Sequence, residues 1–124
     1  MLGIHTITFD SAEPYELGKW WSGLTGWPVA SYEPGDEEVL LEAPDGHPDL
    51  LFIKVPEGKG VKNRVHLDLW PADGATRDEE VQRVLGLGAE PHGDFRRPDG
   101  TGWMTLLDPE GNEFCIVRSQ AERV

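Results

Sequence analysis

The sequence predicts an α+β fold made of two βαβββ modules in tandem, which form a curved mixed sheet around a cleft with the helices outside. The first observation behind this prediction is an internal repeat. Strand-like runs open at His5 and at His66, and each leads through an acidic turn into an amphipathic segment. The second is that both segments end at a glycine, as helices commonly do. Because neither repeat alone could bury its sheet, we expect modules 1–57 and 61–120 to share one domain of 124 residues.

Hydrophobic spacing locates the elements of the first module. Residues 3–9 alternate as in a strand, and the stretch 11–14 offers a helix start with proline in the first turn. Apolar residues then recur at i, i+3, i+4 and i+7, which places them on one helix face that packs into the core. They are Leu17, Trp20, Trp21 and Leu24. Gly26 ends this helix. Three strands are expected after it, at residues 27–29, 38–42 and 50–55.

The second module repeats this order. Residues 65–70 are the predicted strand, and Thr76 with Glu79 makes a capping box at the start of the second helix. Residues 91–100 contain so many helix and strand breakers that we expect a loop there, long enough to border a pocket. The last two strands and the hairpin turn between them are predicted at 102–107, 113–117 and 108–111.

The composition limits the classes of partner. A net charge of −12 repels polyphosphate, which disfavours nucleic acid and anionic membrane surfaces. No apolar stretch reaches the length of a membrane span, and no secretory signal is visible. The single cysteine, Cys115, excludes an internal disulfide and is expected to be a buried strand residue. We therefore expect a cytoplasmic protein whose partner is a small-molecule ligand rather than nucleic acid or a membrane.

Strand alternation directs several polar side chains toward the expected cleft. His66, Asp68 and Trp70 share one face of their strand, while aliphatic residues take the other. Two imidazoles, from His5 and His66, together with the carboxylate of Glu113 are donors that suit a divalent metal. In the alternative interpretation, His66 and Asp68 form a hydrogen-bonded strand pair, and Glu113 holds the preceding turn or pairs with Arg64. Both interpretations stay open at the level of the sequence.

Other residues are candidates for ligand contacts. Trp70 and Trp103 lie in strands that should border the cleft, where an indole can stack on an aromatic or cationic ligand. Arg97 belongs to the 91–100 loop, which can close over a pocket. The offset between the two histidines, carried onward, matches Glu113 to a position near Phe52. Phe52 is therefore expected to line the cleft with an apolar side chain.

Two motifs connect the chain to a known family. They are Asn63–Leu69 (NRVHLDL) and Asp108–Val117 (DPEGNEFCIV), and they occur in the expected order with the Gly88–Ala89 pair between them. With them the chain resembles the vicinal oxygen chelate superfamily, which includes glyoxalase I, bleomycin-resistance proteins, fosfomycin-resistance enzymes and extradiol dioxygenases. It is most similar to the small bacterial glyoxalase-like proteins. The resemblance implies paired βαβββ modules and substrates that bind a metal through adjacent oxygens.

The resemblance also implies site residues and assembly. His5, His66 and Glu113 match the superfamily's metal-ligand positions and would hold zinc, manganese, nickel or iron. Glu113 and Asp68 would be the catalytic carboxylates, Asp68 as a general base. The remaining ligand position of glyoxalase I falls among the apolar residues 51–53, so a site with three donors is expected. A homodimer is expected because many members build their clefts from two chains.

Two classes of function follow from these observations. The first is a metal-dependent enzyme acting on a small molecule, of lyase, isomerase, transferase or dioxygenase type. The second is a metal-free protein that sequesters a cationic or aromatic small molecule, as in bleomycin resistance. The acidic balance and the five tryptophans of the chain favour the second class, and the two histidines favour the first.

Overall fold

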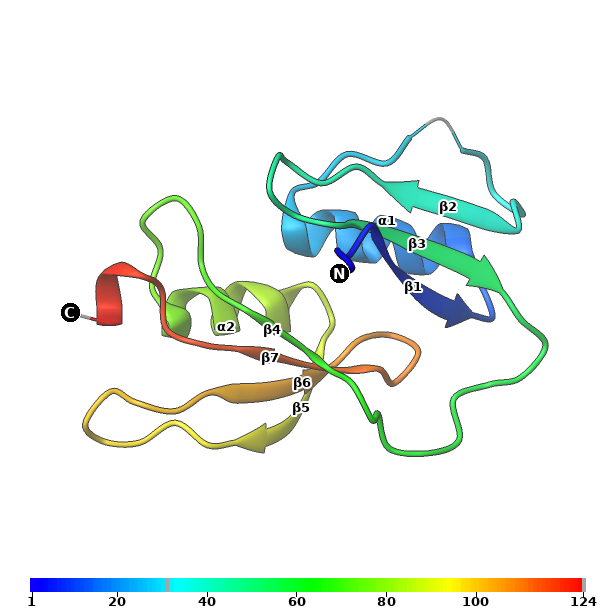
Figure 1. Cartoon of the computed structure of the whole chain (residues 1–124). Helices are drawn as coiled ribbons and strands as arrows, with labels where there is room; N and C mark the ends of the chain where they lie inside the picture. Colours follow the sequence, from blue (N-terminus) through cyan, green and yellow to red (C-terminus); the bar gives the residue numbers. More distant parts are fainter. Residues whose placement is uncertain (31, 124) are drawn as a thin grey trace. The chain divides into compact units, whose positions relative to one another are not determined.

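The computed structural model describes residues 1–30 and 32–123. The chain divides into two compact units, Met1–Gly58 (unit 1) and Lys59–Val124 (unit 2), shown in Figure 1. The boundary between them lies in the turn-rich stretch 56–60. The predicted α+β class is confirmed: each unit contains one α-helix and one small sheet with both parallel and antiparallel strand pairs.

Unit 1 contains a three-stranded sheet and the helix α1. Its elements are β1 (Thr6–Ser11), α1 (Pro14–Thr25), β2 (Glu38–Leu41) and β3 (Asp49–Lys54). The strand order is β1-β3-β2, with β1 parallel and β2 antiparallel to β3. The strand expected at residues 27–29 is reduced to an isolated bridge between Val29 and Leu41. Unit 1 therefore has the predicted order of elements, with one strand shortened to a single pair.

The apolar face of α1 builds the core of unit 1 as its spacing predicts. Leu17, Trp21 and Leu24 are buried. Trp20, which was expected on the same core face, is only half-buried. Pro14 occupies the first helical turn, and the helix ends at Gly26, whose φ of 76° is easy for a residue without a Cβ. Phe52 of β3 is fully buried in the same core, where its ring lies 4.9 Å from that of Phe9.

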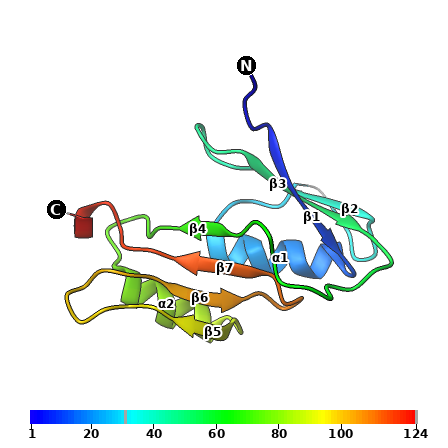
Figure 2. The same ribbon diagram turned by 60° about the horizontal axis from the view of Figure 1, so that its bottom comes forward.

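Unit 2 contains a four-stranded sheet and the helix α2. Its elements are β4 (Leu67–Leu69), α2 (Arg77–Gly86), β5 (Glu90–Asp94), β6 (Met104–Leu107), β7 (Glu113–Ile116) and a final 3₁₀ turn, Ala121–Arg123. The strand order is β4-β7-β6-β5, with β4 parallel to β7 and the other pairs antiparallel, as Figure 2 shows. This unit is a complete βαβββ module.

The strand β5 corrects one prediction. Residues 91–100 were expected to be a loop, but the first of them continue β5 and pair with β6. The expectation fails because β5 is an edge strand, where proline is tolerated, and because its register shifts between Pro91 and Gly93. Such a bulge turns side chains in a direction that simple alternation does not predict. Here the irregular residue is His92.

Local signals at the ends of α2 and β7 are confirmed. The Thr76 hydroxyl accepts a hydrogen bond from the Glu79 amide, and the Glu79 side chain accepts one from the Thr76 amide, which completes the predicted capping box. The hairpin before β7 is closed by Asp108, whose carboxylate accepts hydrogen bonds from the amides of Glu110 and Asn112. No helix in the described part of the chain is both long and apolar enough to span a membrane.

Candidate functional site

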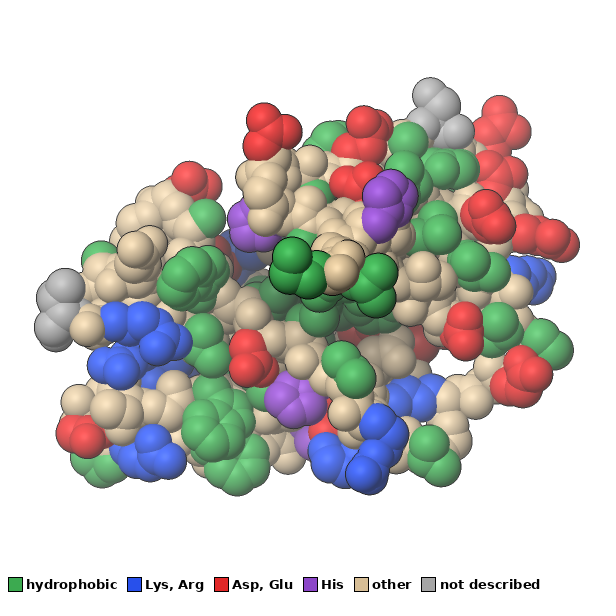
Figure 3. All heavy atoms as spheres, in the orientation of Figure 1, with side chains coloured by type: hydrophobic (Ala, Val, Ile, Leu, Met, Phe, Trp, Pro, Cys, Tyr) green, Lys and Arg blue, Asp and Glu red, His purple; other side chains and the backbone are tan. Residues whose placement is uncertain are grey.

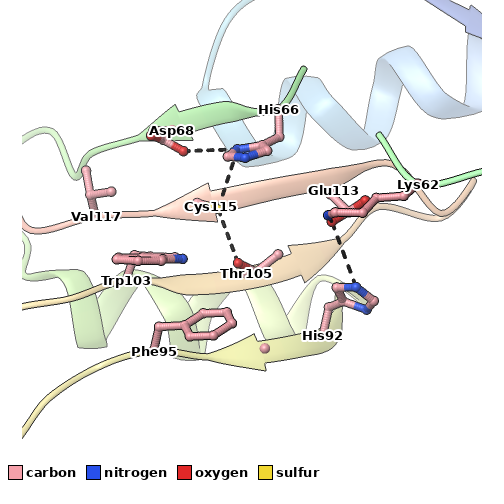
Figure 4. A pocket seen from close by; sticks show the side chains of 11 residues that line it. Lys62, His66, Asp68, His92, Phe95, Trp103, Thr105, Glu113, Cys115 and Val117 are labelled. Atoms are coloured by element: carbon pink, nitrogen blue, oxygen red, sulfur yellow. Dashed lines mark hydrogen bonds and ion pairs between the residues drawn. The ribbon is translucent and has the colours of Figure 1, made fainter. Parts of the chain in front are cut away.

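The face of the unit 2 sheet that is turned away from α2 carries a pocket of about 450 Å³ (Figure 4). Alternation along β7 explains how it forms. Glu113, Cys115 and Val117 line the pocket, whereas Phe114 and Ile116 do not line it and are buried on the other face of the sheet. This division of the strand was predicted from the sequence. The pocket has three parts: a group of metal-ligand residue types in the middle, an ion-paired group, and a pair of aromatic rings.

The middle part, called here the donor group, consists of His66, Asp68 and Cys115. One ligand atom from each of them lies within 4.8 Å of the others. His66 Nδ1 is 3.3 Å from Asp68 Oδ1 and 3.8 Å from Cys115 Sγ. The parallel pairing of β4 with β7 brings them together, because it places Asp68 directly beside Cys115. His66 and Asp68 were expected to share a face, and the structure adds a thiol to them.

The donor group does not have the geometry of an activated thiol nucleophile. In a Cys–His–Asp arrangement the imidazole uses one nitrogen for the thiol and the other for the carboxylate. Here the same nitrogen, Nδ1 of His66, faces both partners. Burial raises the pKa of the Cys115 thiol, while a hydrogen-bond contact with Thr105 Oγ1 at 3.2 Å acts in the opposite direction. A nitrogen, an oxygen and a sulfur donor at this spacing instead fit a divalent ion of the zinc class.

Glu113, the predicted carboxylate ligand, belongs to a second part, the ion-paired group. Its Oε1 accepts a hydrogen bond from Lys62 Nζ at 2.5 Å, and its Oε2 accepts one from the Asn63 amide at 3.0 Å. His92 Nε2 lies 3.8 Å from Oε1. The side chain is only 5 % exposed, and the Lys62 ammonium holds the pKa of Glu113 below its usual range. Its role as a metal ligand stays a prediction, since its carboxylate is engaged by these partners.

Lys62 and His92 line the pocket although the sequence did not single them out for it. Lys62 precedes the NRVHLDL motif in an irregular segment, which gives no periodic signal. His92 belongs to the stretch 91–100, which was expected to be a loop. Its side chain is half exposed, but the bulge in β5 brings it next to Glu113. An edge-strand interpretation of residues 90–94 would have been needed to find it.

Two of the predicted site residues lie in unit 1. His5 immediately precedes β1, is exposed, and shares a hydrogen bond of 2.6 Å between its Nδ1 and the Thr6 hydroxyl. Its role as a metal ligand stays a prediction. Phe52 has 0 % of its surface exposed, so its side chain packs in the core of unit 1 and offers no surface to a ligand.

The strand register also corrects the match between Glu113 and Phe52. In unit 1, Thr6 pairs with Asp49, 43 positions later, whereas in unit 2 the equivalent Leu67 pairs with Phe114, 47 positions later. Unit 2 is therefore longer by four residues between its paired strands. A constant offset fails beyond that insertion, so the counterpart of Glu113 is Pro48.

The third part of the pocket is the aromatic pair Phe95 and Trp103. Their rings stack with centroids 5.2 Å apart and an interplanar angle of 29°. Both line the pocket and both are exposed, by 51 % and 36 %. Trp103 was predicted to border the ligand site, whereas Trp70, also predicted, is 52 % exposed and lies outside the pocket lining. Arg97 does not line the pocket, but its guanidinium lies 5.8 Å from the Trp103 ring centre.

Comparisons with known proteins agree with this architecture. The family model of the glyoxalase-like domain matches residues 6–117. Among solved structures, FosX, a fosfomycin-resistance protein from Listeria monocytogenes, superposes with a TM-score of 0.72 at 16 % identity, covering 100 % of this chain and 99 % of that one. A lactoylglutathione lyase from Agrobacterium tumefaciens gives 0.66 at 18 % identity, with coverages of 97 % and 95 %. TioX from Micromonospora sp. ML1 gives 0.64 at 16 % identity, with coverages of 94 % and 98 %.

These similarities define what is shared. A mutant of the Listeria FosX has been solved with Mn(II) and 1S,2S-dihydroxypropylphosphonic acid, so one protein of this fold holds a divalent metal together with a small oxygen-rich ligand. The search of curated proteins finds no match. At sequence identities below one fifth, the structural similarity shows a common fold alone. Activity depends on which residues occupy the site. The match over residues 6–117 shows that the chain belongs to the glyoxalase-like domain family, within the vicinal oxygen chelate superfamily.

Proposed function

We propose that this protein binds a small molecule in the pocket of unit 2 and acts on it with a divalent metal held by His66, Asp68 and Cys115. The observation that carries the proposal is the convergence of these three side chains within 4.8 Å on the pocket wall. Within residues 1–30 and 32–123, they make up the one group of three or more metal-ligand residue types found at such spacing. Relative to the ligand set expected from the sequence, this set keeps His66 and has Asp68 and Cys115 in place of His5 and Glu113.

The chemistry of the donors favours zinc. Imidazole and thiolate select borderline and soft ions, while a carboxylate alone suits magnesium or calcium. Three protein ligands leave a coordination position open, as in catalytic rather than structural zinc sites. When bound, such an ion would supply a Lewis acid that polarises a substrate oxygen. Since zinc has no redox chemistry, a lyase, isomerase or transferase type of reaction is favoured over a dioxygenase.

The protein's own residues have distinct roles in this proposal. His66 presents its donor from the residue just before β4, and Asp68 from the middle of β4. Their side chains are 44 % and 58 % exposed, so they are accessible to an incoming ion. Cys115 is buried, and its raised pKa means that ion binding must displace a proton from its thiol. Metal affinity should therefore rise with pH.

Zinc and cobalt(II) titrations of five variants test the ligand set. His66→Ala, Asp68→Asn and Cys115→Ser should each weaken binding by more than about tenfold. Glu113→Gln and His5→Ala distinguish this set from the one expected from the sequence. In wild-type protein, cobalt should give the near-ultraviolet absorption of a cobalt–thiolate bond, and Cys115→Ser should abolish it. Normal binding by Cys115→Ser together with loss in Glu113→Gln would replace the set by His5, His66 and Glu113.

Metal-free binding of a small molecule is the second candidate. The specific observation in its favour is the 3.3 Å contact between His66 Nδ1 and Asp68 Oδ1, which pairs these two side chains with each other without an ion. Absence of stoichiometric zinc after equilibrium dialysis of the wild-type protein, combined with ligand binding in the pocket, would establish this candidate and reject the metal.

We also propose that the protein forms a homodimer. The support is physical: β4 lies at the edge of its sheet, and two large apolar side chains flank it in exposed positions, Val65 at 78 % and Trp70 at 52 %. Unpaired strand edges and exposed apolar groups favour association. Sedimentation at micromolar concentration should show a dimer, and Val65→Asp should shift it toward the monomer. A monomeric wild type would reject this proposal.

A further inference from the structure

The stacked rings of Phe95 and Trp103 are held in place at the pocket by the backbone around them. The two rings come from opposite sides of the β5–β6 hairpin, whose backbone is closed beside them by a hydrogen bond from the Phe95 amide to the Trp103 carbonyl. Figure 4 shows Trp103 with Phe95 on one side of its ring and the donor group on the other. Figure 3 shows hydrophobic side chains gathered over β5 and β6 on the same part of the surface.

Two glycines make room for the Phe95 side of this arrangement. A Cβ at Gly93 would lie 2.6 Å from Cε2 of the Phe95 ring, so the ring rests directly on the backbone there. At Gly102 a Cβ would lie 2.0 Å from the Phe95 carbonyl oxygen, and φ is +93°. A larger residue at Gly93 would displace the Phe95 ring, and one at Gly102 would displace the hairpin backbone. The aromatic pair is therefore held close by backbone contact and not by side-chain packing alone.

Arg77 fixes the other end of the hairpin. Its side chain is 6 % exposed, and Nη1 donates hydrogen bonds to three successive carbonyls at 3.0 to 3.1 Å, those of Gly100, Thr101 and Gly102. Hydrogen bonds from a charged donor are the stronger kind. The Arg97 guanidinium, within cation–π distance of Trp103, adds a further restraint. Large aromatic side chains held in place in this way, yet exposed to a pocket, keep a stacking surface ready for a ligand.

We infer that the ligand of this pocket carries a flat aromatic group, which stacks on the Trp103 face opposite Phe95. The inference rests on the small-molecule part of the proposed function and not on the metal. The pocket volume of about 450 Å³ is in the range of small-molecule sites and exceeds what a two- or three-carbon substrate requires. The polar end of the ligand is directed to the donor group, and its flat apolar end to the hairpin. Phe95 and Trp103 are thus specificity-determining residues.

A pair of matched probes tests this inference in metal-free protein. 2-Naphthol and decahydro-2-naphthol share one carbon skeleton and one hydroxyl group, but only the first is flat and aromatic. We expect 2-naphthol to bind about tenfold more tightly than its saturated counterpart. In ¹⁵N-labelled protein it should shift the Trp103 indole N–H resonance through its ring current, and leave the Trp70 resonance in place. Equal affinities of the two probes, or an unmoved Trp103 signal at saturation, would overturn the inference.

Variants assign the effect to the pair. Trp103→Leu and Phe95→Leu should each reduce 2-naphthol affinity by about tenfold and remove the preference over the saturated probe, whereas Trp70→Leu should change neither. His66→Ala separates the two proposals. If it abolishes zinc binding but keeps the naphthol preference, both stand. If wild-type protein binds no zinc yet prefers 2-naphthol through Trp103, the metal proposal fails and the aromatic one holds. Unchanged preference in Trp103→Leu rejects the aromatic one alone.

Discussion

The two units share a scaffold and differ at the positions where chemistry is carried. In each, a histidine immediately precedes a strand that pairs in parallel with the last strand of the unit. Two residues after the histidine, unit 1 has Ile7 beside Leu50, whereas unit 2 has Asp68 beside Cys115. The same backbone pairing therefore builds an apolar contact in one unit and a donor group in the other. A repeated fold does not imply a repeated site.

The units differ again at the opposite edge of their sheets. In unit 1 the strand that follows the helix is a single bridge at Val29. In unit 2 it is β5, whose bulge directs His92 to the pocket and whose hairpin carries Phe95 and Trp103. Strand β5 and its hairpin therefore form one wall of the pocket, beside the donor group. The pocket of unit 2 thus depends on both differences.

The largest expected effect tests whether Phe52 serves only the core of unit 1 and takes no part in ligand binding. Phe52→Ala removes a fully buried ring and should lower the free energy of unfolding by about 3–5 kcal/mol, since it leaves a cavity in the core of unit 1. Urea denaturation measures this change. In folded protein, zinc and 2-naphthol affinities should stay within about twofold of wild type. A stable variant with lost ligand binding would restore Phe52 to the binding site.

The next effect concerns the hydrogen bonds by which Arg77 holds the β5–β6 hairpin of unit 2, called here the Arg77 clamp. Arg77→Met removes a charged donor from three carbonyls and should destabilise the protein by about 1.5–3 kcal/mol. Hydrogen exchange at the Phe95 and Arg97 amides, which bond across the hairpin, should become faster. Arg83→Met is the matched control, because Arg83 lies on the exposed side of α2 and should cost less than about 1 kcal/mol. Equal effects of the two variants would contradict a clamp.

A smaller effect distinguishes the starts of the two helices. Helix α2 has a capping box, while α1 begins at Pro14 without a side-chain cap. Thr76→Ala should lower the free energy of unfolding by about 1 kcal/mol. Thr76→Ser should keep most of this stabilisation, because the serine hydroxyl can still accept a hydrogen bond from the Glu79 amide. Thermal and urea unfolding would show this. An unaffected Thr76→Ala variant would mean that packing alone holds α2.

The smallest expected effect concerns the ion-paired group and appears in the pH dependence of the free energy of unfolding. Lys62→Met should raise the pKa of Glu113 toward its ordinary value, because the ammonium is the main cause of its lowering. In wild type, a depressed folded-state pKa gives stability that is complete above about pH 4.3 and is lost as the pH falls through the folded value. As the pH falls over the same range, the Lys62→Met variant should therefore lose less of its free energy of unfolding than the wild type does. Carbon NMR titration of the Glu113 carboxyl measures the shift, with Lys59→Met as control. An unchanged pKa would remove Lys62 as its cause.

Much of the local structure could be predicted because it depends on neighbours in the sequence. The face of α1, the glycine that ends it, the capping box of α2 and the turn at Asp108 all involve residues a few positions apart. Alternation along β7 likewise placed Glu113 and Cys115 on the pocket side. The edge strand β5 escaped prediction because its tolerance of proline depends on having no neighbour on one side.

The sequence by itself determined the fold class, the family motifs and the identity of His66 and Asp68 as pocket residues. Only the tertiary structure decided which third side chain stands beside them. That choice depends on the register of β4 against β7, which pairs residues 47 positions apart and includes a four-residue difference from unit 1. Register is set by packing and hydrogen bonds between strands, which no local pattern encodes. For the same reason Glu113 lies beside Lys62 and Asn63, and Cys115 lies beside His66.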